Sequence, residues 1–143
     1  MEIVRTARDM QSAAERLRGA GKRIGLVPTM GYLHQGHTSL IRIARQHSDT
    51  VVTTIFVNPA QFGPKEDIER YPRDFPRDET LAREAGTDIL FCPEVKDMYA
   101  EGFRTYVTTE QVEDVLEGKF RPGHFRGVTT VVAKLFNIAK PHV

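Results

Sequence analysis

Two histidines flank a glycine where an apolar segment gives way to a helical pattern. The stretch VPTMGYLHQGHTSL covers residues 27–40 and places His34 and His37 three positions apart, with Gly36 between them. A helix N-terminus offers free N–H groups and the positive end of the helix dipole, which favour phosphate. Residues three apart share a helix face, so both imidazoles could donate hydrogen bonds to one anion. Because Gly36 has no side chain, a bulky ligand could approach the backbone there. The spacing predicts a phosphate-binding turn.

A plainer interpretation makes the two histidines surface residues or helix caps. Other ligand-binding motifs fit the sequence less well. A P-loop needs Ser or Thr after Gly-Lys, but Arg23 follows Gly21 and Lys22. A dinucleotide-binding glycine pattern follows its strand, whereas the glycines at 19 and 21 precede theirs. The histidine pair also lacks the HExxH spacing and the cysteine partners of zinc sites, so no metal site is predicted.

The composition restricts the class of protein. The chain has 143 residues, a formal net charge of +1 and 40% hydrophobic residues, which suits one globular domain. The near-neutral balance argues against a nucleic-acid partner. The sequence shows neither an apolar run of transmembrane length nor a signal peptide, so no membrane partner is expected. Cys92 is the single cysteine, which excludes an intrachain disulfide and favours a reducing, cytoplasmic setting.

Strands alternate with helices along the chain. Buried strands are predicted at 23–29, 51–57 and 87–93, and a further strand near an edge at 105–109. The first predicted helix starts at residue 6 and is ended by the glycines at 19 and 21; the others are predicted at 40–47, 79–86, 109–118 and 128–140. The segment 63–79 is predicted to be largely loop. The core strands are apolar throughout, which indicates a parallel sheet covered on both faces. Ligands bind such sheets outside the carboxyl ends of the strands. The stretches VPTMG and FVNPAQF both lie at predicted carboxyl ends.

The histidine turn resembles the H-x-G-H signature of the nucleotidyltransferase superfamily that includes class I aminoacyl-tRNA synthetases. Together, VPTMGYLHQGHTSL, IFVNPAQFGPKEDIERYPRD and LEGKFRPGHFRGVTTVVAKLFNI closely resemble the pantothenate synthetases, or pantoate–β-alanine ligases. The resemblance covers nearly the whole chain. It implies a Rossmann-like α/β fold, with residues 1–143 forming the amino-terminal nucleotide-binding domain of a longer enzyme.

The resemblance implies an activity and its partners. Members of this family join pantoate to β-alanine using ATP and Mg²⁺, and they typically form homodimers. The pantoate carboxylate attacks the α-phosphate of ATP, which gives pantoyl adenylate and pyrophosphate. The amine of β-alanine then displaces AMP and forms the amide.

The resemblance also assigns the ATP-binding segment. This segment comprises Met30, Gly31, Tyr32, Leu33, His34, Gln35, Gly36 and His37. The two histidines would act in catalysis at the phosphates, with His37 in the position of the family's proton donor. An imidazolium that neutralises phosphate charge needs to transfer no proton, so both roles remain open for His37.

The substrate-binding assignments also follow from the resemblance. Gln61 would contact pantoate and β-alanine, since its amide both donates and accepts hydrogen bonds. Asn58 would shape the loop that presents Gln61. Pro28 and Thr29, together with Met30, would line the floor of the pocket. Arg121, before Pro122, is instead assigned from its own chemistry: a guanidinium binds carboxylate or phosphate bidentately and would meet an anion. The alternative for this basic turn is a solvated surface loop.

Some segments of the family pattern have no counterpart in the 143 residues. Family members continue with a Gly-Glu-Lys-Asp type segment and a smaller carboxy-terminal domain that carries a lysine-serine loop. The expectation is therefore an incomplete domain that binds ATP weakly and turns over little by itself. Two alternatives stay open: a nucleotidyltransferase of the same superfamily that acts on another small acid, and a non-catalytic dimerising fragment. Gln61 within FVNPAQFGP favours the pantoate ligase over the first alternative.

Overall fold

The fold is built around a parallel β-sheet. The structure, a computed structural model, describes residues 1–63, 66, 68–111, 115 and 117–143. Within them β1 (Glu2–Val4), β2 (Ile24–Val27), β3 (Thr50–Thr54) and β4 (Ile89–Phe91) form a four-stranded sheet in the order β1-β4-β3-β2. Every neighbouring pair is parallel. The predicted α/β class with a parallel sheet is confirmed.

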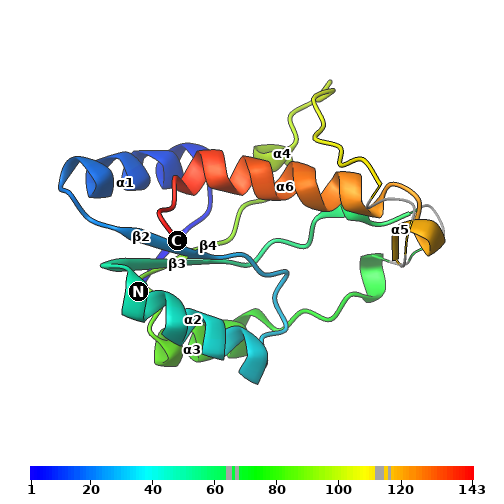
Figure 1. Cartoon of the computed structure of the whole chain (residues 1–143). Helices are drawn as coiled ribbons and strands as arrows, with labels where there is room; N and C mark the ends of the chain where they lie inside the picture. Colours follow the sequence, from blue (N-terminus) through cyan, green and yellow to red (C-terminus); the bar gives the residue numbers. More distant parts are fainter. Residues whose placement is uncertain (64–65, 67, 112–114, 116) are drawn as a thin grey trace.

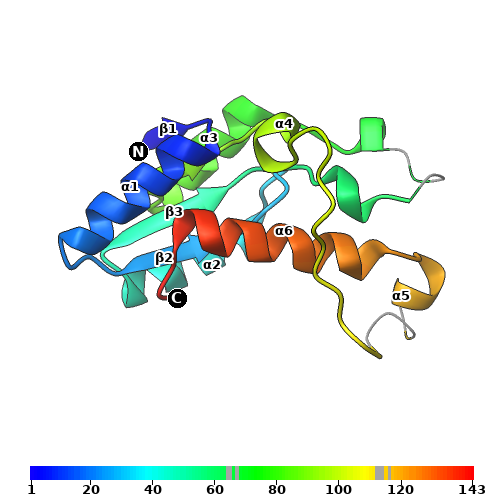
Figure 2. The ribbon, with the colours of Figure 1, turned by 90° about the horizontal axis from the view of Figure 1, so that it is seen from above.

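Helices cover both faces of the sheet (Figure 1). On one face lie α1 (Ala7–Gly19) and α6 (His124–Ala139), and on the other α2 (Gln35–His47) and α3 (Phe75–Ala85). The shorter elements are η1 (Pro59–Gln61), η2 (Ile68–Arg70), α4 (Val95–Met98) and α5 (Glu117–Phe120). Figure 2 shows that α6 lies beside α1 and that its N-terminal half continues past the carboxyl ends of the strands. This helix can therefore form a wall above the region where a parallel sheet binds ligands.

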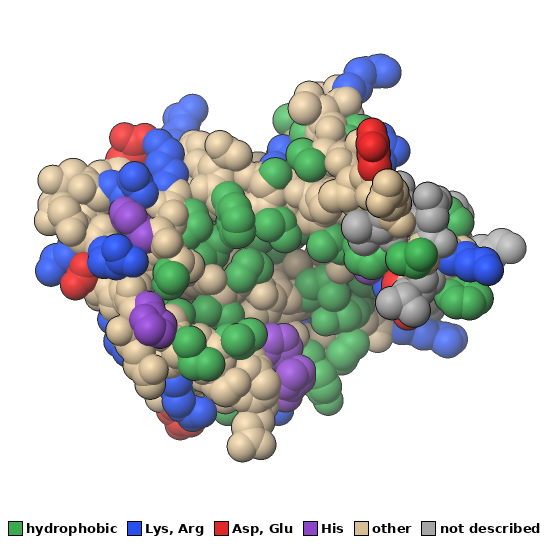
Figure 3. Space-filling model, in the orientation of Figure 1, with side chains coloured by type: hydrophobic (Ala, Val, Ile, Leu, Met, Phe, Trp, Pro, Cys, Tyr) green, Lys and Arg blue, Asp and Glu red, His purple; other side chains and the backbone are tan. Residues whose placement is uncertain are grey.

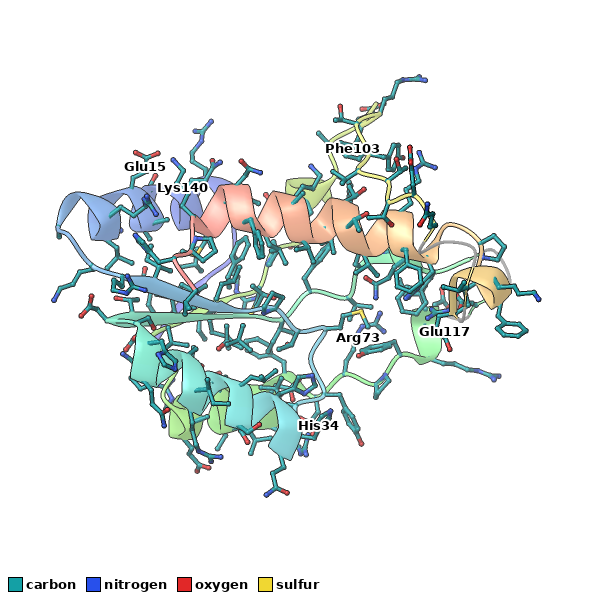
Figure 4. All side chains as sticks on the ribbon, viewed as in Figure 1. Glu15, His34, Arg73, Phe103, Glu117 and Lys140 are labelled. Carbon is teal, nitrogen blue, oxygen red and sulfur yellow. The ribbon has the colours of Figure 1, made fainter. Side chains whose placement is uncertain are left out.

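The core strands show almost no alternation of polar and apolar residues because an apolar layer covers each face of the sheet. Val52 of β3 packs in the cluster shared with α1 and α6, whereas its neighbour Val51 packs with Ile41 and Ala44 of α2. Successive side chains of a strand point to opposite faces, so both faces must be apolar when both are covered. On the first face, Lys140 at the end of α6 also forms an ion pair with Glu15 of α1 (Figure 4).

The fourth strand does not lie where the sequence predicted it. Residues 105–109 are not a strand, and the edge strand beside β4 is β1 at the N-terminus. The backbone of Val107 bonds to α6 instead: its N–H donates to Thr130 Oγ1 at 3.0 Å, and its carbonyl accepts from Thr129 Oγ1 at 2.6 Å. In the middle of this segment, the backbone of Val107 therefore pairs with a helix rather than with a strand. The three-residue β1 is too short to show a periodic pattern.

Three helices start earlier than predicted, and capping side chains account for the earlier starts of α2 and α3. The α2 helix begins at Gln35 rather than near 40, directly after the capping residue His34. The α3 helix begins at Phe75, inside the segment predicted as loop, because Asp74 Oδ1 accepts the N–H of Arg77 at 3.2 Å. The α6 helix begins at His124, four residues earlier than predicted. Of the helix predicted at 109–118, residues 112–114 and 116 lie outside the described residues. Residues 109–111 and 115 are not helical, and α5 begins only at Glu117.

Candidate nucleotide and substrate site

The two histidines cap the helix that follows them. His34 is the N-cap of α2, and its Nδ1 accepts the N–H of Gly36 at 3.1 Å. In return, the N–H of His34 donates to Nδ1 of His37 at 3.3 Å. The ring centroids lie 4.0 Å apart. The helix-cap interpretation is therefore confirmed, and the same contacts bring both imidazoles to one helix end, where Figure 4 labels His34.

These contacts determine which nitrogen of each ring can donate. An Nδ1 atom that accepts a hydrogen bond carries no proton, so each neutral ring holds its proton on Nε2. Burial lowers the pKa of His37 below its ordinary value of 6.5, the neighbouring His34 lowers it further, and Asp78 opposes both effects. At neutral pH His37 therefore presents an Nε2–H donor rather than a positive charge. Such donors suit phosphate oxygens.

Gly36 has a structural reason to be glycine. A β-carbon at this position would lie 2.9 Å from Cε1 of His34 and 3.1 Å from its Nδ1. Any larger residue would push the capping ring away from the helix end. The glycine between the histidines thus permits the cap, and the space beside its backbone is taken by the His34 ring rather than left open to a ligand.

The turn before the histidines is fixed by polar contacts to its neighbours. Thr29 ties it to β3, since its Oγ1 donates to the carbonyl of Thr54 at 2.5 Å and its N–H donates to Thr54 Oγ1 at 3.1 Å. Thr29 Oγ1 also accepts the N–H of Gly31 at 3.1 Å. On the other side, Asp78 of α3 accepts the N–H groups of Tyr32 and Leu33. The turn is therefore held at both ends.

Asn58 organises the loop after β3. It is 1% exposed, and its Nδ2 donates to Gln61 Oε1 and to the carbonyl of Gly127, both at 3.0 Å. Its Oδ1 accepts the hydroxyl of Tyr99 at 2.7 Å and the N–H of Ala60 at 3.3 Å. A buried amide with its hydrogen-bonding groups satisfied fixes the surrounding backbone. The expected role of Asn58 in shaping the loop agrees with this geometry.

One cavity collects most of the predicted substrate residues. It has a volume of about 310 Å³ and is lined by Pro28, Thr29, Met30, His37, Phe56, Asn58, Gln61, Tyr71, Val128, Val131, Val132 and Leu135. The amide of Gln61 lies 3.0 Å from Sδ of Met30, so these two side chains meet in its wall. Figure 3 shows hydrophobic side chains and histidines gathered around the recess between α2 and α6. The size and the mixed lining suit a small organic ligand.

The cavity has an apolar side and a polar side. The residues from α6 are spaced i, i+3, i+4 and i+7, which places them on one helix face: Val128, Val131, Val132 and Leu135. The polar lining of the cavity includes His37, Gln61 and Tyr71. Burial and the charge of Asp78 raise the pKa of Tyr71, so this phenol stays protonated and can donate a hydrogen bond.

Other predicted residues lie outside this cavity. Nε of Arg121 donates to the carboxylate of Glu66, and Arg121 lines a smaller recess of about 160 Å³ beside it. Within the predicted ATP segment, Leu33 is fully buried in the core, whereas Tyr32 and Gln35 are exposed. Arg121 thus lies outside the cavity that contains His37, but it stays beside Gln61: its Nη2 donates to the Gln61 carbonyl at 3.5 Å, and both residues line the smaller recess.

Sequence reasoning missed three contributions to the site: Asp78, Tyr71 and the α6 wall. Asp78 could have been noticed in the sequence, because this carboxylate shares the buried face of α3 with Ala82 and Ala85. The α6 wall has helical spacing in the sequence, but only the fold shows that it faces the loop after β3. Tyr71 carries no such signal.

Metal-binding and membrane-spanning features are both missing from the described residues. No group of three or more His, Cys, Asp or Glu side chains among them could hold a metal ion. None of the helices in the described part of the chain is long and apolar enough to span a bilayer.

Cys92 is buried, and burial raises the pKa of its thiol to about 11, which agrees with the expectation of a small apolar core residue.

Comparison with known proteins gives consistent matches over the whole chain. The family model described as pantoate-beta-alanine ligase matches residues 2–143. Pantothenate synthetases of Acetivibrio thermocellus and Chloroherpeton thalassium are each 56% identical to the chain, over 142 and 143 residues. These alignments cover 99% and 100% of the chain but 50% of each relative. The chain thus spans about half the length of the curated relatives it matches.

Solved structures show the same similarity. The pantothenate synthetase of Thermus thermophilus superposes with a TM-score of 0.91 at 50% identity, over 99% of this chain and 50% of that one. The pantoate-beta-alanine ligase of Francisella tularensis, complexed with beta-gamma ATP and beta-alanine, gives a TM-score of 0.92 at 41% identity. That match covers 99% of this chain and 54% of the other.

Proposed function

Since the chain belongs to the pantoate–β-alanine ligase family, we propose that it forms the amino-terminal nucleotide-binding part of an enzyme that joins pantoate to β-alanine using ATP. The observation that carries the proposal is the cavity that brings Gln61 and Met30 together with His37 at the N-terminus of α2. In this arrangement a site for a small acid adjoins a site for phosphate. Those two ligands must meet when a carboxylate is adenylated.

The geometry suggests how the substrates are oriented. The ATP phosphates lie at the start of α2, where the Nε2–H groups of His34 and His37 donate to them. Pantoate enters the cavity with its two methyl groups against the α6 wall and its polar groups toward Gln61 and Tyr71. Its carboxylate then points toward His37 and the α-phosphate.

The reaction proceeds in two displacements. In the first, a carboxylate oxygen of pantoate bonds to the α-phosphorus, and the bond to pyrophosphate breaks. In the second, the amine of β-alanine bonds to the carbonyl carbon, the bond to AMP breaks, and the amine releases a proton. The apolar wall helps to exclude water, which would otherwise hydrolyse the mixed anhydride. The first step has no proton to transfer, so a neutral His37 that donates a hydrogen bond is sufficient there.

Mg²⁺ belongs to the proposal as a companion of ATP. Because the described residues contain no three-membered group of metal-ligating side chains, that part of the chain does not itself form a cage for the ion. Mg²⁺ keeps several water ligands and commonly binds through substrate phosphates. It would then reduce the phosphate charge that the protein must meet.

The proposal includes weak activity for the 143-residue chain alone. One helix terminus and two imidazoles, of which His37 has a lowered pKa, supply little positive charge for a triphosphate, so we expect weak ATP binding and slow turnover. Homodimer formation and a cytoplasmic location also belong to the proposal. Sedimentation equilibrium measures the first, and localisation of a tagged protein in cells measures the second.

Exchange of labelled pyrophosphate into ATP tests the function with high sensitivity. We expect slow exchange that requires pantoate, and release of AMP only after β-alanine is added. The His37→Ala variant should abolish both. Exchange supported by another small acid but not by pantoate would favour the alternative acceptor. A dimer without nucleotide affinity would favour the non-catalytic alternative.

A further inference from the structure

The carboxylate of Asp78 lies directly beneath the turn that leads into the histidine pair. This side chain is 1% exposed and comes from α3, which packs beside α2. Its Oδ2 accepts the N–H of Tyr32 at 2.7 Å, and its Oδ1 accepts the N–H of Leu33 at 2.6 Å. Both are charge-assisted hydrogen bonds to consecutive backbone groups. A buried carboxylate is costly unless such partners satisfy it.

The turn needs this support because its backbone is unfavourable. Gly31 has φ 85° and Tyr32 has φ 51°, so both lie in the left-handed region. Glycine adopts this conformation freely, but a bulky residue such as tyrosine does so at a cost of about 1 kcal/mol or more. A β-carbon on Gly31 would lie 3.0 Å from Oδ2 of Asp78, which shows how closely the carboxylate approaches the turn. The conformation persists because surrounding contacts hold it.

We propose that Asp78 is a positioning residue of the phosphate-binding turn: its buried carboxylate holds the Tyr32 and Leu33 amides, and thereby sets the N-terminus of α2 and the His34–His37 pair for the ligand. Asp78 does not itself contact the phosphates. Its oxygens bond to the turn on the α3 side, whereas the Nε2 atoms of the capped rings point away from their Nδ1 contacts. The part of this inference that concerns a phosphate ligand rests on the proposed function. The part that concerns the turn does not.

Several charged or titratable groups face this carboxylate. Arg77, its neighbour on α3, places Nη1 3.8 Å from Oδ1, and the guanidinium also lies 5.3 Å from the centre of the Tyr32 ring. On α2, burial and His34 lower the pKa of His37, and the carboxylate of Asp78 offsets part of this decrease. On the loop before α3, burial and then the charge of Asp78 raise the pKa of Tyr71. The raised pKa of the Cys92 thiol after β4 has a minor contribution from Asp78. Removing the charge of Asp78 must therefore be visible at His37.

The Asp78→Asn variant tests the proposal, with Glu79→Gln as the matched control. Both changes remove one negative charge from α3 without altering side-chain size, but Glu79 forms its ion pair with the exposed Arg83 one helical turn away. The experiment uses the ¹⁵N-labelled chain and follows the amide signals of Tyr32 and Leu33, the pKa of His37, and the affinity for inorganic pyrophosphate and for ATP. For Asp78→Asn we expect shifted amide signals, a lower pKa of His37 and an affinity reduced about tenfold.

The control variant should leave all three quantities unchanged. A folded Asp78→Asn variant with wild-type amide signals, His37 pKa and affinity would overturn the proposal. A merely structural role would lower the free energy of unfolding but would not change the affinity of the folded protein. The pKa of His37 responds to the lost charge in either case, so the affinity decides between the two roles. If the wild-type chain bound neither pyrophosphate nor ATP, the proposed function would fail, while the amide signals and the pKa would still test Asp78.

A second measurement needs no variant, which matters if Asp78→Asn fails to fold. Scalar couplings across hydrogen bonds can be measured from the Tyr32 and Leu33 amides of the wild-type chain to the carboxyl carbon of Asp78. We expect both couplings at neutral pH. Their absence would show that the carboxylate does not hold the turn, and would overturn the proposal.

Discussion

Replacing Gly127 with alanine should force α6 away from the loop that carries Gln61. A β-carbon at position 127 would lie 2.2 Å from the carbonyl oxygen of Ala60 and 2.6 Å from Cα of Gln61. These are backbone atoms, so a flexible side chain cannot move aside to relieve the clash. To reach the 3.4 Å at which ordinary contact begins, the two backbones must separate by roughly 1.2 Å. The change therefore tests whether close approach at Gly127 positions the substrate loop.

The expected cost combines three terms. Overpacking of this kind costs about 1–3 kcal/mol. The separation also breaks the bond from Asn58 to the carbonyl of Gly127, and a buried group left without its partner costs about 1–3 kcal/mol more. Alanine is better than glycine inside a helix by about 1 kcal/mol, which offsets part of the loss. The net result is a decrease of about 3 kcal/mol in the free energy of unfolding.

Urea denaturation followed by circular dichroism measures this quantity, with Gly19→Ala as the control. Gly19 ends α1, and a β-carbon there would meet nothing within 4 Å. The control should be neutral or should stabilise the chain by less than about 1 kcal/mol, because it gains helix propensity without a clash. The two alanine substitutions are thus expected to change stability in opposite directions.

A second assay examines the loop itself. Binding of pantoate to folded Gly127→Ala should be weaker than to the wild type, since the Asn58–Gln61 loop is displaced from its position against α6. The reasoning is refuted if Gly127→Ala unfolds within about 0.5 kcal/mol of the wild type. Loss of stability with unchanged pantoate binding would refute the link between the close approach and the substrate loop.

Three further predictions follow from the site. The pKa of His37 lies below its unfolded value of 6.5, so the unfolded chain binds more protons between the two values, and the free energy of unfolding should fall as the pH drops through this window. Urea denaturation at neutral pH and near pH ~5.5 should show this fall, and His37→Gln should reduce it. Tyr99→Phe removes the hydroxyl that donates to Asn58 and should cost about 1 kcal/mol in the same assay. Gln61→Ala should weaken pantoate binding about tenfold in a calorimetric titration and leave ATP binding unchanged.

The fold class could be predicted because the sheet is covered on both faces. Such coverage requires apolar residues at successive positions, and β3 and β4 show this directly in the sequence. The edge strand was misplaced because local pattern does not encode its partner. Val107 lies in a β-branched run yet bonds to α6, whereas Ile3 lies in a short polar context yet pairs with β4. In both cases tertiary contacts outweigh β-propensity.

The site was predictable where residue type and spacing carry the chemistry. The histidine pair follows from position and spacing alone, and Gln61 follows from the family resemblance. Asp78 was missed because its function depends on a contact between α3 and the turn before α2, which are separated by 45 residues along the chain. Arg121 was placed by its chemistry, but Glu66 already occupies its guanidinium in the structure. Such pairings are tertiary and leave no local signal.

The capping contacts also bear on the two roles left open for His37. As a proton donor, this residue would first have to become an imidazolium, which carries a proton on Nδ1 as well as on Nε2. That nitrogen now accepts the N–H of His34, so protonation would break the cap at a cost of about 1 kcal/mol. The Nε2–H group, which would donate to a phosphate in the proposed function, is the same in both forms. Because adenylation of a carboxylate transfers no proton, the neutral ring supplies the required hydrogen bond and keeps the helix end intact. We therefore expect His37 to act by donating a hydrogen bond to the phosphates.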